Sequence, residues 1–198
     1  MGKYYGVLFI LAVYFVLPGQ LWAQSTPDSP NYEQALEKLR LYVPEDAFVR
    51  KDLGLKEKSG QFHLGQIDAE IVIIEIFSMY CPHCQKHAPT TNALYELITS
   101  RKDLKNKVKF IGIGVGNSPY EVKIFREKYS IAFPLFDDRD SAATNALSGV
   151  VTPYYFGIRI HKDASLRVFY AEAGAFDDPS VFLDMILKAA AQSTGDGS

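Results

Sequence analysis

The chain has 198 residues, of which 47% are hydrophobic and 22% are charged, a composition typical of an ordinary globular protein. Its 21 Lys and Arg residues and 23 Asp and Glu residues give a formal net charge of -2. This balance argues against a broad basic surface for nucleic acid. The length suits one domain with a full core, and the two cysteines, Cys81 and Cys84, are too few and too close for the disulfide framework of a small secreted scaffold.

The first 23 residues have the three-part layout of a secretory signal peptide. Lys3 carries a positive charge, residues 4–17 contain no charged residue, and Pro18-Gly19 precedes Ala23, the small residue before the expected cut. The 14 uncharged residues fall short of the ~20 that span a bilayer. We therefore favour cleavage over an uncleaved membrane anchor, which remains the alternative.

Cleavage would leave a chain with 20 basic and 23 acidic residues, a net charge of -3. We expect this chain to work in an oxidising compartment, most simply a bacterial periplasm, with no stable membrane span once the leader is removed.

The exported chain begins with a predicted linker and short helix over residues 24–45, in which Asn31 can cap the helix. Two short strands are predicted next, at residues 47–50 and 61–64. The main domain is expected to run over residues 46–190 and to be followed by a flexible tail, residues 191–198.

The centre of the predicted domain is a strand, helix and strand. Residues 71–77 and 108–115 are apolar and rich in β-branched side chains, as expected for strands buried on both faces. The helix-like stretch 82–100 lies between them. Because this is a βαβ unit, the two strands should pair in parallel.

A second helix has a clear start signal, since Ser118 can cap it and Pro119 and Glu121 occupy the favoured positions behind the cap. It is predicted to run to about Tyr129. A short strand at 133–136 and a short helix at 141–147 follow.

The last predicted elements are an antiparallel hairpin and a helix. Residues 154–160 and 166–170 form the hairpin. The helix opens at Asp178-Pro179, and its expected inward side chains are Val181, Phe182, Met185 and Ile186.

The two cysteines belong to the sequence Cys81-Pro82-His83-Cys84, at the passage from strand 71–77 into helix 82–100. Two thiols three residues apart at a helix start can close a disulfide with little rearrangement. The first thiol lies where free amides and the helix dipole stabilise its anion. The pattern therefore predicts Cys81 as a nucleophile and Cys84 as the thiol that resolves the intermediate.

Two other uses of this pair remain open. A purely structural disulfide would close only a four-residue loop, which contributes roughly 2 kcal/mol against about 3 for a loop of fifteen. A copper or zinc carrier could use Cys81, Cys84 and His87, with His83 as a fourth ligand, but no further Cys completes the set. We therefore expect no bound metal and keep the carrier as the rival function.

On these residues the chain resembles a thioredoxin-superfamily thiol-disulfide oxidoreductase. Residues 75–84, with the Pro-His dipeptide, are similar to the active-site segment of the DsbA family. Pro89 falls at the helix-kinking proline of the superfamily, and Thr152-Pro153 falls at its cis-proline. The resemblance covers roughly residues 46–190.

The spacing departs from DsbA, because only 69 positions separate Cys84 from Pro153. That is too short for the helical domain that DsbA-like proteins insert there. The chain is longer than a plain thioredoxin by about the length of residues 118–136. This arrangement resembles the TlpA/ResA branch. The resemblance implies an α/β thioredoxin-like fold, with a central mixed sheet, flanking helices and a helix-strand insertion before the cis-proline.

The resemblance also implies roles for the site residues. Cys81 would attack a protein disulfide and Cys84 would resolve the mixed disulfide, so that the pair cycles through a Cys81-Cys84 disulfide. Glu75 falls where family members carry a buried acid and would shuttle a proton to Cys84. Pro153 would turn the backbone toward the incoming peptide. No cofactor is needed.

Pro82, His83 and Thr152 are expected to support these residues, with His83 stabilising the Cys81 thiolate. The expected partners are protein dithiols or disulfides in the periplasm and a membrane redox partner. The Pro-His dipeptide leans toward an oxidase, whereas the TlpA-like spacing and Thr152 lean toward a reductase or isomerase, so the direction of electron flow stays open.

The neighbours of the pair have simpler expected roles. His87 lies four residues after His83 and is expected on the surface. Met79 and Tyr80 are expected to form an apolar lip beside Cys81, and Tyr154 and Tyr155 another beside Pro153.

Overall fold

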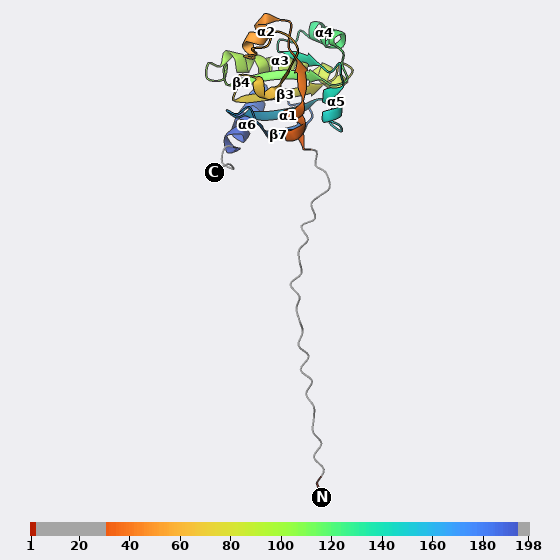
Figure 1. Ribbon diagram of the computed structural model, residues 1–198, viewed down its shortest axis with the longest axis vertical. Helices are drawn as coiled ribbons and strands as arrows, with labels where there is room; N and C mark the ends of the chain where they lie inside the picture. Colours follow the sequence, from red (N-terminus) through yellow and green to blue (C-terminus); the bar gives the residue numbers. More distant parts are fainter. Residues whose placement is uncertain (3–30, 194–198) are drawn as a thin grey trace.

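The structure is a computed structural model and describes residues 1–2 and 31–193 (Figure 1). The predicted signal peptide beyond residue 2, the linker up to residue 30 and the last five residues of the predicted tail lie outside the described residues.

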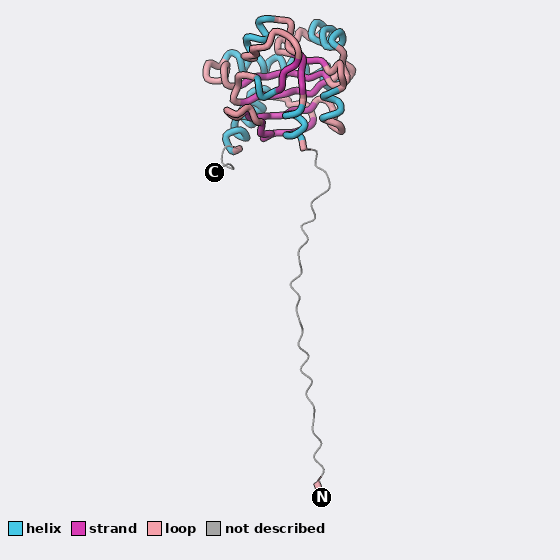
Figure 2. Tube along the Cα trace, in the orientation of Figure 1, coloured by secondary structure: helices cyan, strands magenta, loops and turns pink. Residues whose placement is uncertain are grey.

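A five-stranded mixed sheet forms the centre of the domain, as predicted (Figure 2). The strand order is β5-β4-β3-β6-β7. Strands β3, β4 and β5 run parallel to one another. β6 pairs antiparallel with β3, and β7 pairs antiparallel with β6. Their bounds are β3 (Ile71–Phe77), β4 (Val108–Gly114), β5 (Leu135–Asp137), β6 (Tyr154–Ile160) and β7 (Leu166–Ala173).

The two central strands are buried along their whole length, because other elements cover both faces of the sheet. On one face, Ile73 and Phe77 pack with helices α3 (Pro82–Ser100) and α6 (Pro179–Gln192). α4 (Pro119–Lys128) contributes Phe125, which stacks on Phe77 with ring centroids 4.7 Å apart. This face carries the Cys81 and Cys84 region.

The other face is covered by smaller elements, which are α1 (Tyr32–Lys38), a two-stranded sheet of β1 (Arg40–Tyr42) and β2 (Gln61–His63), the 3-10 helix η1 (Leu64–Gln66) and α5 (Ala142–Ala146). Leu36, Leu39 and Leu41 are buried there against Val72 and Ile74 of β3. The hydrophobic core therefore includes residues that precede position 46.

The first helix also meets an edge of the main sheet. Glu33 accepts a hydrogen bond from the Val168 amide at 3.0 Å, and Glu37 accepts one from the Leu166 amide at 3.2 Å. Leu166 and Val168 belong to β7, the last strand in the sheet order.

One predicted strand is wrong, because residues 47–50 belong to a helix, α2 (Ala47–Asp52). Asp46 caps it by accepting a hydrogen bond from the Phe48 amide at 2.7 Å, and Arg50 and Lys51 lie in the last turn, which favours a helix C-terminus. The predicted strand at 61–64 is present as β2, except that Leu64 begins η1.

The predicted inward face of the last helix is also partly wrong. Phe182 and Ile186 are buried, but Val181 is 66% exposed and Met185 is 41% exposed. The buried stripe is Phe182, Leu183, Ile186 and Ala190, whose spacing of one, four and eight residues follows the 3.6-residue period. Val181 and Met185 lie on the flank of that stripe.

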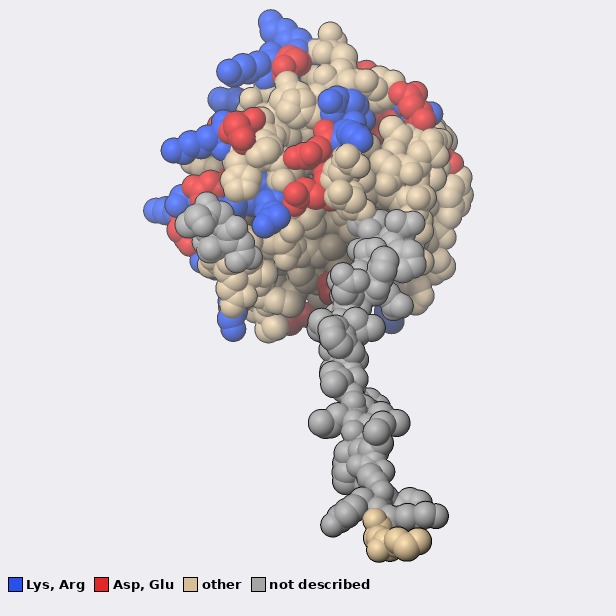
Figure 3. All heavy atoms as spheres, turned by 60° about the horizontal axis from the view of Figure 1, so that its bottom comes forward, with Lys and Arg blue, Asp and Glu red and all other residues tan. Residues whose placement is uncertain are grey.

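Among the described residues, none of the helices combines the length and apolarity needed to cross a membrane. Lys and Arg side chains lie among Asp and Glu side chains on the face drawn in Figure 3. That face carries no extended field of a single charge.

Candidate active site

The Cys81 sulfur caps the helix that follows it. β3 ends at Phe77 and α3 begins at Pro82, with Cys81 as the N-cap residue and Pro82 in the first turn. The Cys84 amide donates a hydrogen bond to Cys81 Sγ at 3.3 Å. A sulfur in this position accepts from the free amides of the first turn, which favours its anionic form.

The loop that carries Cys81 is held on both sides of Met79. Asn117 Oδ1 accepts a hydrogen bond from the Met79 amide at 2.8 Å, and Gln85 Nε2 donates to the Met79 carbonyl at 2.7 Å. Asn117 is 1% exposed. The sequence reasoning did not identify Asn117 or Gln85 as site residues, although a polar residue just after a buried strand was a usable signal for Asn117.

Thr152 and Pro153 meet Cys81 from the opposite side of the site. The Thr152-Pro153 peptide bond is cis, and Cys81 Sγ lies 3.2 Å from the Thr152 carbonyl oxygen. β6 starts at the next residue and pairs with β3, which brings residues 71 positions apart in sequence into contact.

The two thiols have opposite electrostatic environments. Burial raises the pKa of Cys81, but hydrogen bonds from Thr152, from the Cys84 thiol and from the backbone of Cys84 and His83 outweigh it, so that this pKa is lowered. Burial, the hydrogen bond to Cys81 and the charge of Glu75 raise the pKa of Cys84. Cys81 is partly exposed and Cys84 is buried, and both are free thiols.

Glu75 is 3% exposed and lies inside the apolar strand β3. The Glu75 carboxyl therefore lies in the core and not on an exposed face of the sheet. Burial raises the pKa of Glu75 to about 8, against a smaller opposing effect of the hydrogen bond from Tyr155. The charge of Glu75 contributes to the raised pKa of Cys84, which places the two groups within electrostatic reach of each other.

The expected surface position of His87 is wrong, because His87 is 6% exposed. Its ring nitrogens contact Tyr155 Oη at 3.0 Å and the Phe176 carbonyl at 2.6 Å. His87 lies on the same buried side of α3 as Cys84, three residues earlier, whereas His83 is exposed. The role predicted for His83 stays a prediction.

Tyr155 also differs from its expected position in an apolar lip. It is 1% exposed, and its hydroxyl donates to Glu75 Oε1 at 3.3 Å. Successive residues of a strand point to opposite faces, so that Tyr155 enters the core while Tyr154 packs beside Tyr32 on the other side. Tyr80 is exposed beside Cys81, and its hydroxyl bonds to Glu121.

Within residues 31–193 no three His, Cys, Asp or Glu side chains are placed to hold one metal ion. Both ring nitrogens of His87 have protein partners. The predicted ligand set of the rival metal carrier is therefore not assembled in this arrangement.

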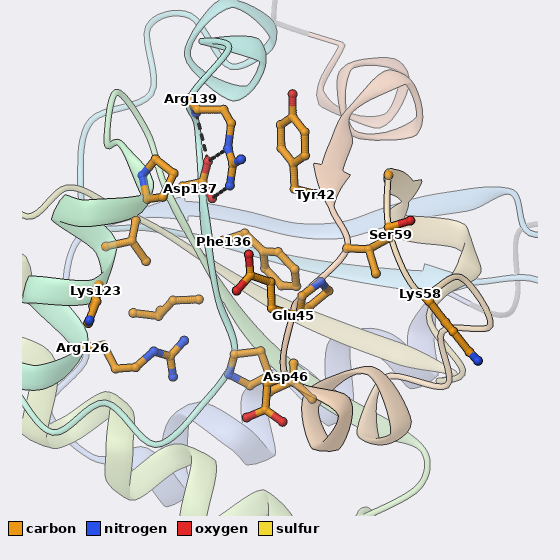
Figure 4. A pocket seen from close by; sticks show the side chains of 18 residues that line it. Tyr42, Glu45, Asp46, Lys58, Ser59, Lys123, Arg126, Phe136, Asp137 and Arg139 are labelled. Carbon is orange, nitrogen blue, oxygen red and sulfur yellow. Dashed lines mark hydrogen bonds and ion pairs between the residues drawn. The ribbon is translucent and has the colours of Figure 1, made fainter.

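A pocket of about 590 Å³ lies away from the cysteines, between α4 with β5 and the segments around residues 42–49 and 58–60 (Figure 4). Asp137 and Arg139 form an ion pair at 2.6 Å at its edge, and the Arg139 guanidinium lies 4.1 Å from the centre of the Tyr42 ring. None of the predicted site residues lines this pocket.

The order of strands and helices defines a thioredoxin-like α/β fold, with Cys81 and Cys84 at the start of its central helix. Residues 46–170 match the model of the AhpC/TSA family, and the chain belongs to this family.

Two solved structures illustrate the shared fold. A secreted disulfide oxidoreductase of Mycobacterium tuberculosis, homologous to E. coli DsbE, superposes with a TM-score of 0.52 at 14% identity and covers 79% of this chain and 98% of its own. StoA from Bacillus subtilis superposes with a TM-score of 0.50 at 14% identity, and the match covers 64% of this chain and 89% of StoA. At this identity the likeness shows the fold alone.

Two curated relatives are both named thiol-disulfide oxidoreductase ResA. The protein from Geobacillus kaustophilus is 26% identical over 99 residues, which is 50% of this chain and 52% of the relative. The protein from Geobacillus thermodenitrificans is 26% identical over 96 residues, which is 48% of this chain and 52% of the relative. The chain spans about half the length of the curated relatives it matches.

Proposed function

We propose that this chain is an exported thiol-disulfide oxidoreductase that exchanges the Cys81-Cys84 pair with protein substrates through a mixed disulfide. The observation that carries the proposal is the asymmetry of the two thiols. Cys81 is partly exposed with a lowered pKa, and Cys84 is buried with a raised one. This is the arrangement of one attacking thiolate and one thiol held in reserve. The names of the curated relatives support the same activity.

Reduction of a substrate would proceed in two displacements. The Cys81 thiolate attacks one sulfur of the substrate disulfide, the substrate S–S bond breaks, and the first substrate thiolate leaves and takes up a proton. Cys84 then gives its proton to Glu75 and attacks Cys81 Sγ. The mixed disulfide breaks, the second substrate thiolate leaves and is protonated, and Cys81 and Cys84 are joined. The protein loses two electrons and the substrate gains two.

Substrate contact is proposed at the backbone before β6. Pro153 has no amide hydrogen to donate, and Thr152 already lies against Cys81. Tyr80 on one side and Val151 on the other are exposed, at 66% and 64%. An extended peptide presented to Cys81 would meet these apolar side chains.

The predicted signal peptide supports export, and we propose a periplasmic location with a membrane protein as the redox partner. A Cys pair that must be reset after each turnover needs a second redox protein. The composition offers no broad basic surface, which argues against a nucleic acid partner.

The activity is tested with a peptide disulfide as substrate. The intact protein should reduce it when supplied with electrons, and Cys81→Ala should lose exchange altogether. Cys84→Ala should still attack and should accumulate a mixed disulfide that mass spectrometry detects. Full exchange by Cys81→Ala would overturn the proposal.

The direction of electron flow is tested by equilibrating the pair with glutathione buffers, with and without Cu(I). A reduction potential of about -270 mV would support a reductase, and a potential of about -120 mV would support an oxidase. Tight stoichiometric Cu(I) binding that blocks exchange would instead support the metal carrier.

A further inference from the structure

Glu75 creates a difficulty for the exchange cycle. Burial raises the pKa of Glu75 to about 8, so that its carboxyl is mostly protonated at pH 7. A protonated carboxyl cannot accept the proton of Cys84. Glu75 therefore needs a group that takes its own proton away when Cys84 has to react.

Among the residues that the structure describes, apolar groups and no cation lie beside Glu75 on the β4 side. The register partner of Glu75 in β4 is Gly112, which has no side chain. A methyl group there would lie 2.5 Å from Leu135 and 3.2 Å from the Phe133 ring, so that this side of Glu75 is filled by apolar groups. On the β6 side the register partner is Tyr155.

Tyr155 joins Glu75 to His87. The Tyr155 hydroxyl lies 3.3 Å from Glu75 Oε1 and 3.0 Å from His87 Nδ1. All three side chains are buried, with exposed fractions of 3%, 1% and 6% for Glu75, Tyr155 and His87. The three groups come from β3, β6 and α3, and form one continuous line of hydrogen bonds.

The far end of this line lies under the segment between β7 and α6. His87 Nε2 is 2.6 Å from the Phe176 carbonyl and 3.2 Å from the Phe176 amide. The shorter contact indicates that Nε2 carries a hydrogen and donates it to the carbonyl. The neighbouring Asp177 is exposed, and its charge favours the protonated imidazole.

We propose that Glu75, Tyr155 and His87 form a proton relay, through which the carboxyl near Cys84 passes its proton to His87 during thiol-disulfide exchange. This inference rests on the proposed function. Glu75 acts on Cys84, and Tyr155 and His87 act through Glu75 as positioning residues.

The proton balance is closed in two arrangements. In the first, Glu75 is protonated, so its bond with Tyr155 runs in the opposite direction to the bond that an ionised carboxylate accepts from the hydroxyl. The Glu75 carboxyl donates to Tyr155 Oη, Tyr155 donates to His87 Nδ1, and His87 is neutral. In the second, the carboxyl proton has moved to Tyr155 and the Tyr155 proton to Nδ1. This leaves a Glu75 carboxylate, a neutral Tyr155 and an imidazolium. The Glu75 carboxylate then takes the proton of Cys84, and the Cys84 thiolate attacks Cys81. The imidazolium releases its extra proton to solvent on the side of the exposed Asp177, and this balances the proton that the second substrate thiolate takes up as it leaves.

Within residues 31–193, further titratable groups on α3, on β7 and between β7 and α6 act on the relay or its ends. Cys84 on α3 faces Glu75 and Tyr155, and Tyr170 on β7 faces Tyr155. Asp177, between β7 and α6, faces His87. Burial lowers the pKa of His87 and raises that of Tyr155, so that the relay rests with its proton on Glu75 and the imidazolium forms only in passing.

The first test needs no variant. Nuclear magnetic resonance of the intact protein, with labelled Glu and His, follows the Glu75 carboxyl carbon and the His87 ring nitrogens from pH 5 to about pH 10. We expect each group to report the titration of the other. Independent titration of the two groups would overturn the relay.

The second test uses Tyr155→Phe, which removes only the hydroxyl, and His87→Gln, which keeps a polar side chain but cannot be protonated near neutral pH. Tyr95→Phe removes a hydroxyl from α3 outside the line and is the matched control. The rate of the second step, release of the second substrate thiol, is measured by rapid mixing against pH.

We expect both relay variants to slow this step by about tenfold at pH 7, and the loss to disappear above about pH 9, where Glu75 is ionised without help. Alkylation of Cys81 by iodoacetamide should keep its normal pH profile. A slowing that is equal at every pH, or no slowing, would overturn the relay. A wild-type protein without any exchange would instead contradict the proposed function.

Discussion

Glu75 and Tyr155 are register partners on the antiparallel strands β3 and β6, and the Tyr155 hydroxyl and the buried Glu75 carboxyl lie within hydrogen-bond distance, at 3.3 Å. A carboxyl group at this depth would be costly without a partner. The partner comes from the strand that begins directly after Pro153, so the segment that meets Cys81 also holds the acid beneath it.

The burial of Glu75 predicts a characteristic dependence of stability on pH. Its pKa is raised from 4.5 to about 8 in the folded protein. The folded state therefore binds this proton more tightly, and the resulting stability is present below about pH 4.5 and is lost as pH rises through about 8. Glu75→Gln should remove this dependence.

The natural chain should lose a few kcal/mol of its free energy of unfolding between pH 5 and pH 8 that Glu75→Gln does not lose. Urea unfolding of both proteins at the two pH values measures this difference. Parallel stability curves for the two proteins would show that the Glu75 carboxyl is not held neutral by burial.

Asn117 should be required for the geometry of Cys81. Asn117→Ala leaves the Met79 amide without its partner, which costs about 1 to 3 kcal/mol for a buried donor. We expect lower stability in urea and slower alkylation of Cys81. Asn92→Ala is the control, because Asn92 makes similar bonds to Ser130 and Ala132 away from the site. Equal effects of both variants on Cys81 would contradict a specific role for Asn117.

Thr152 should contribute to the lowered pKa of Cys81. Burial opposes that lowering, and hydrogen bonding from Thr152 is the largest effect in its favour. Thr152→Val removes the hydroxyl at nearly constant volume, so the midpoint of the Cys81 alkylation profile should move to higher pH. Thr99→Val is the matched control in α3, since the Thr99 hydroxyl bonds only within its own helix. An unchanged midpoint in Thr152→Val would rule out the contribution of the hydroxyl.

Gly112→Ala should destabilise the protein without touching a thiol. The added methyl group would lie 2.5 Å from Leu135 and 3.3 Å from Phe77 in the packed face of the sheet. Overpacking of this kind costs about 1 to 3 kcal/mol. Thermal or urea unfolding measures the loss, and a variant as stable as the natural chain would mean that Leu135 and Phe133 move aside freely.

The sequence predicts the parts of this site that depend on local pattern. Residues 71–77 and 108–115 are apolar enough to identify the two central strands, and Cys81 to Cys84 at the following helix start indicates the reactive pair. Ser118 caps its helix with Glu121 in the predicted capping box. These features each depend on residues close together in the chain.

The features that the sequence did not predict depend on long-range contacts. His87 appears polar and helical, and only the packing of α3 on β6 and on residue 176 shows that it is buried. The short segment at 47–50 suits a strand by composition, but Asp46 and the basic last turn favour a helix. Val181 and Met185 are apolar, yet the neighbouring Leu183 and Ala190 occupy the core side.

The two carboxylates of α1 have a further consequence for the proposed exchange with protein substrates. An exposed strand edge offers free amides to any extended peptide and invites strand addition and aggregation. Glu33 and Glu37 occupy the outward amides of Val168 and Leu166, and the strand at the opposite edge, β5, has only three residues. In the proposed function, the chain would present Cys81 to an extended substrate peptide while giving that peptide little opportunity to join the sheet.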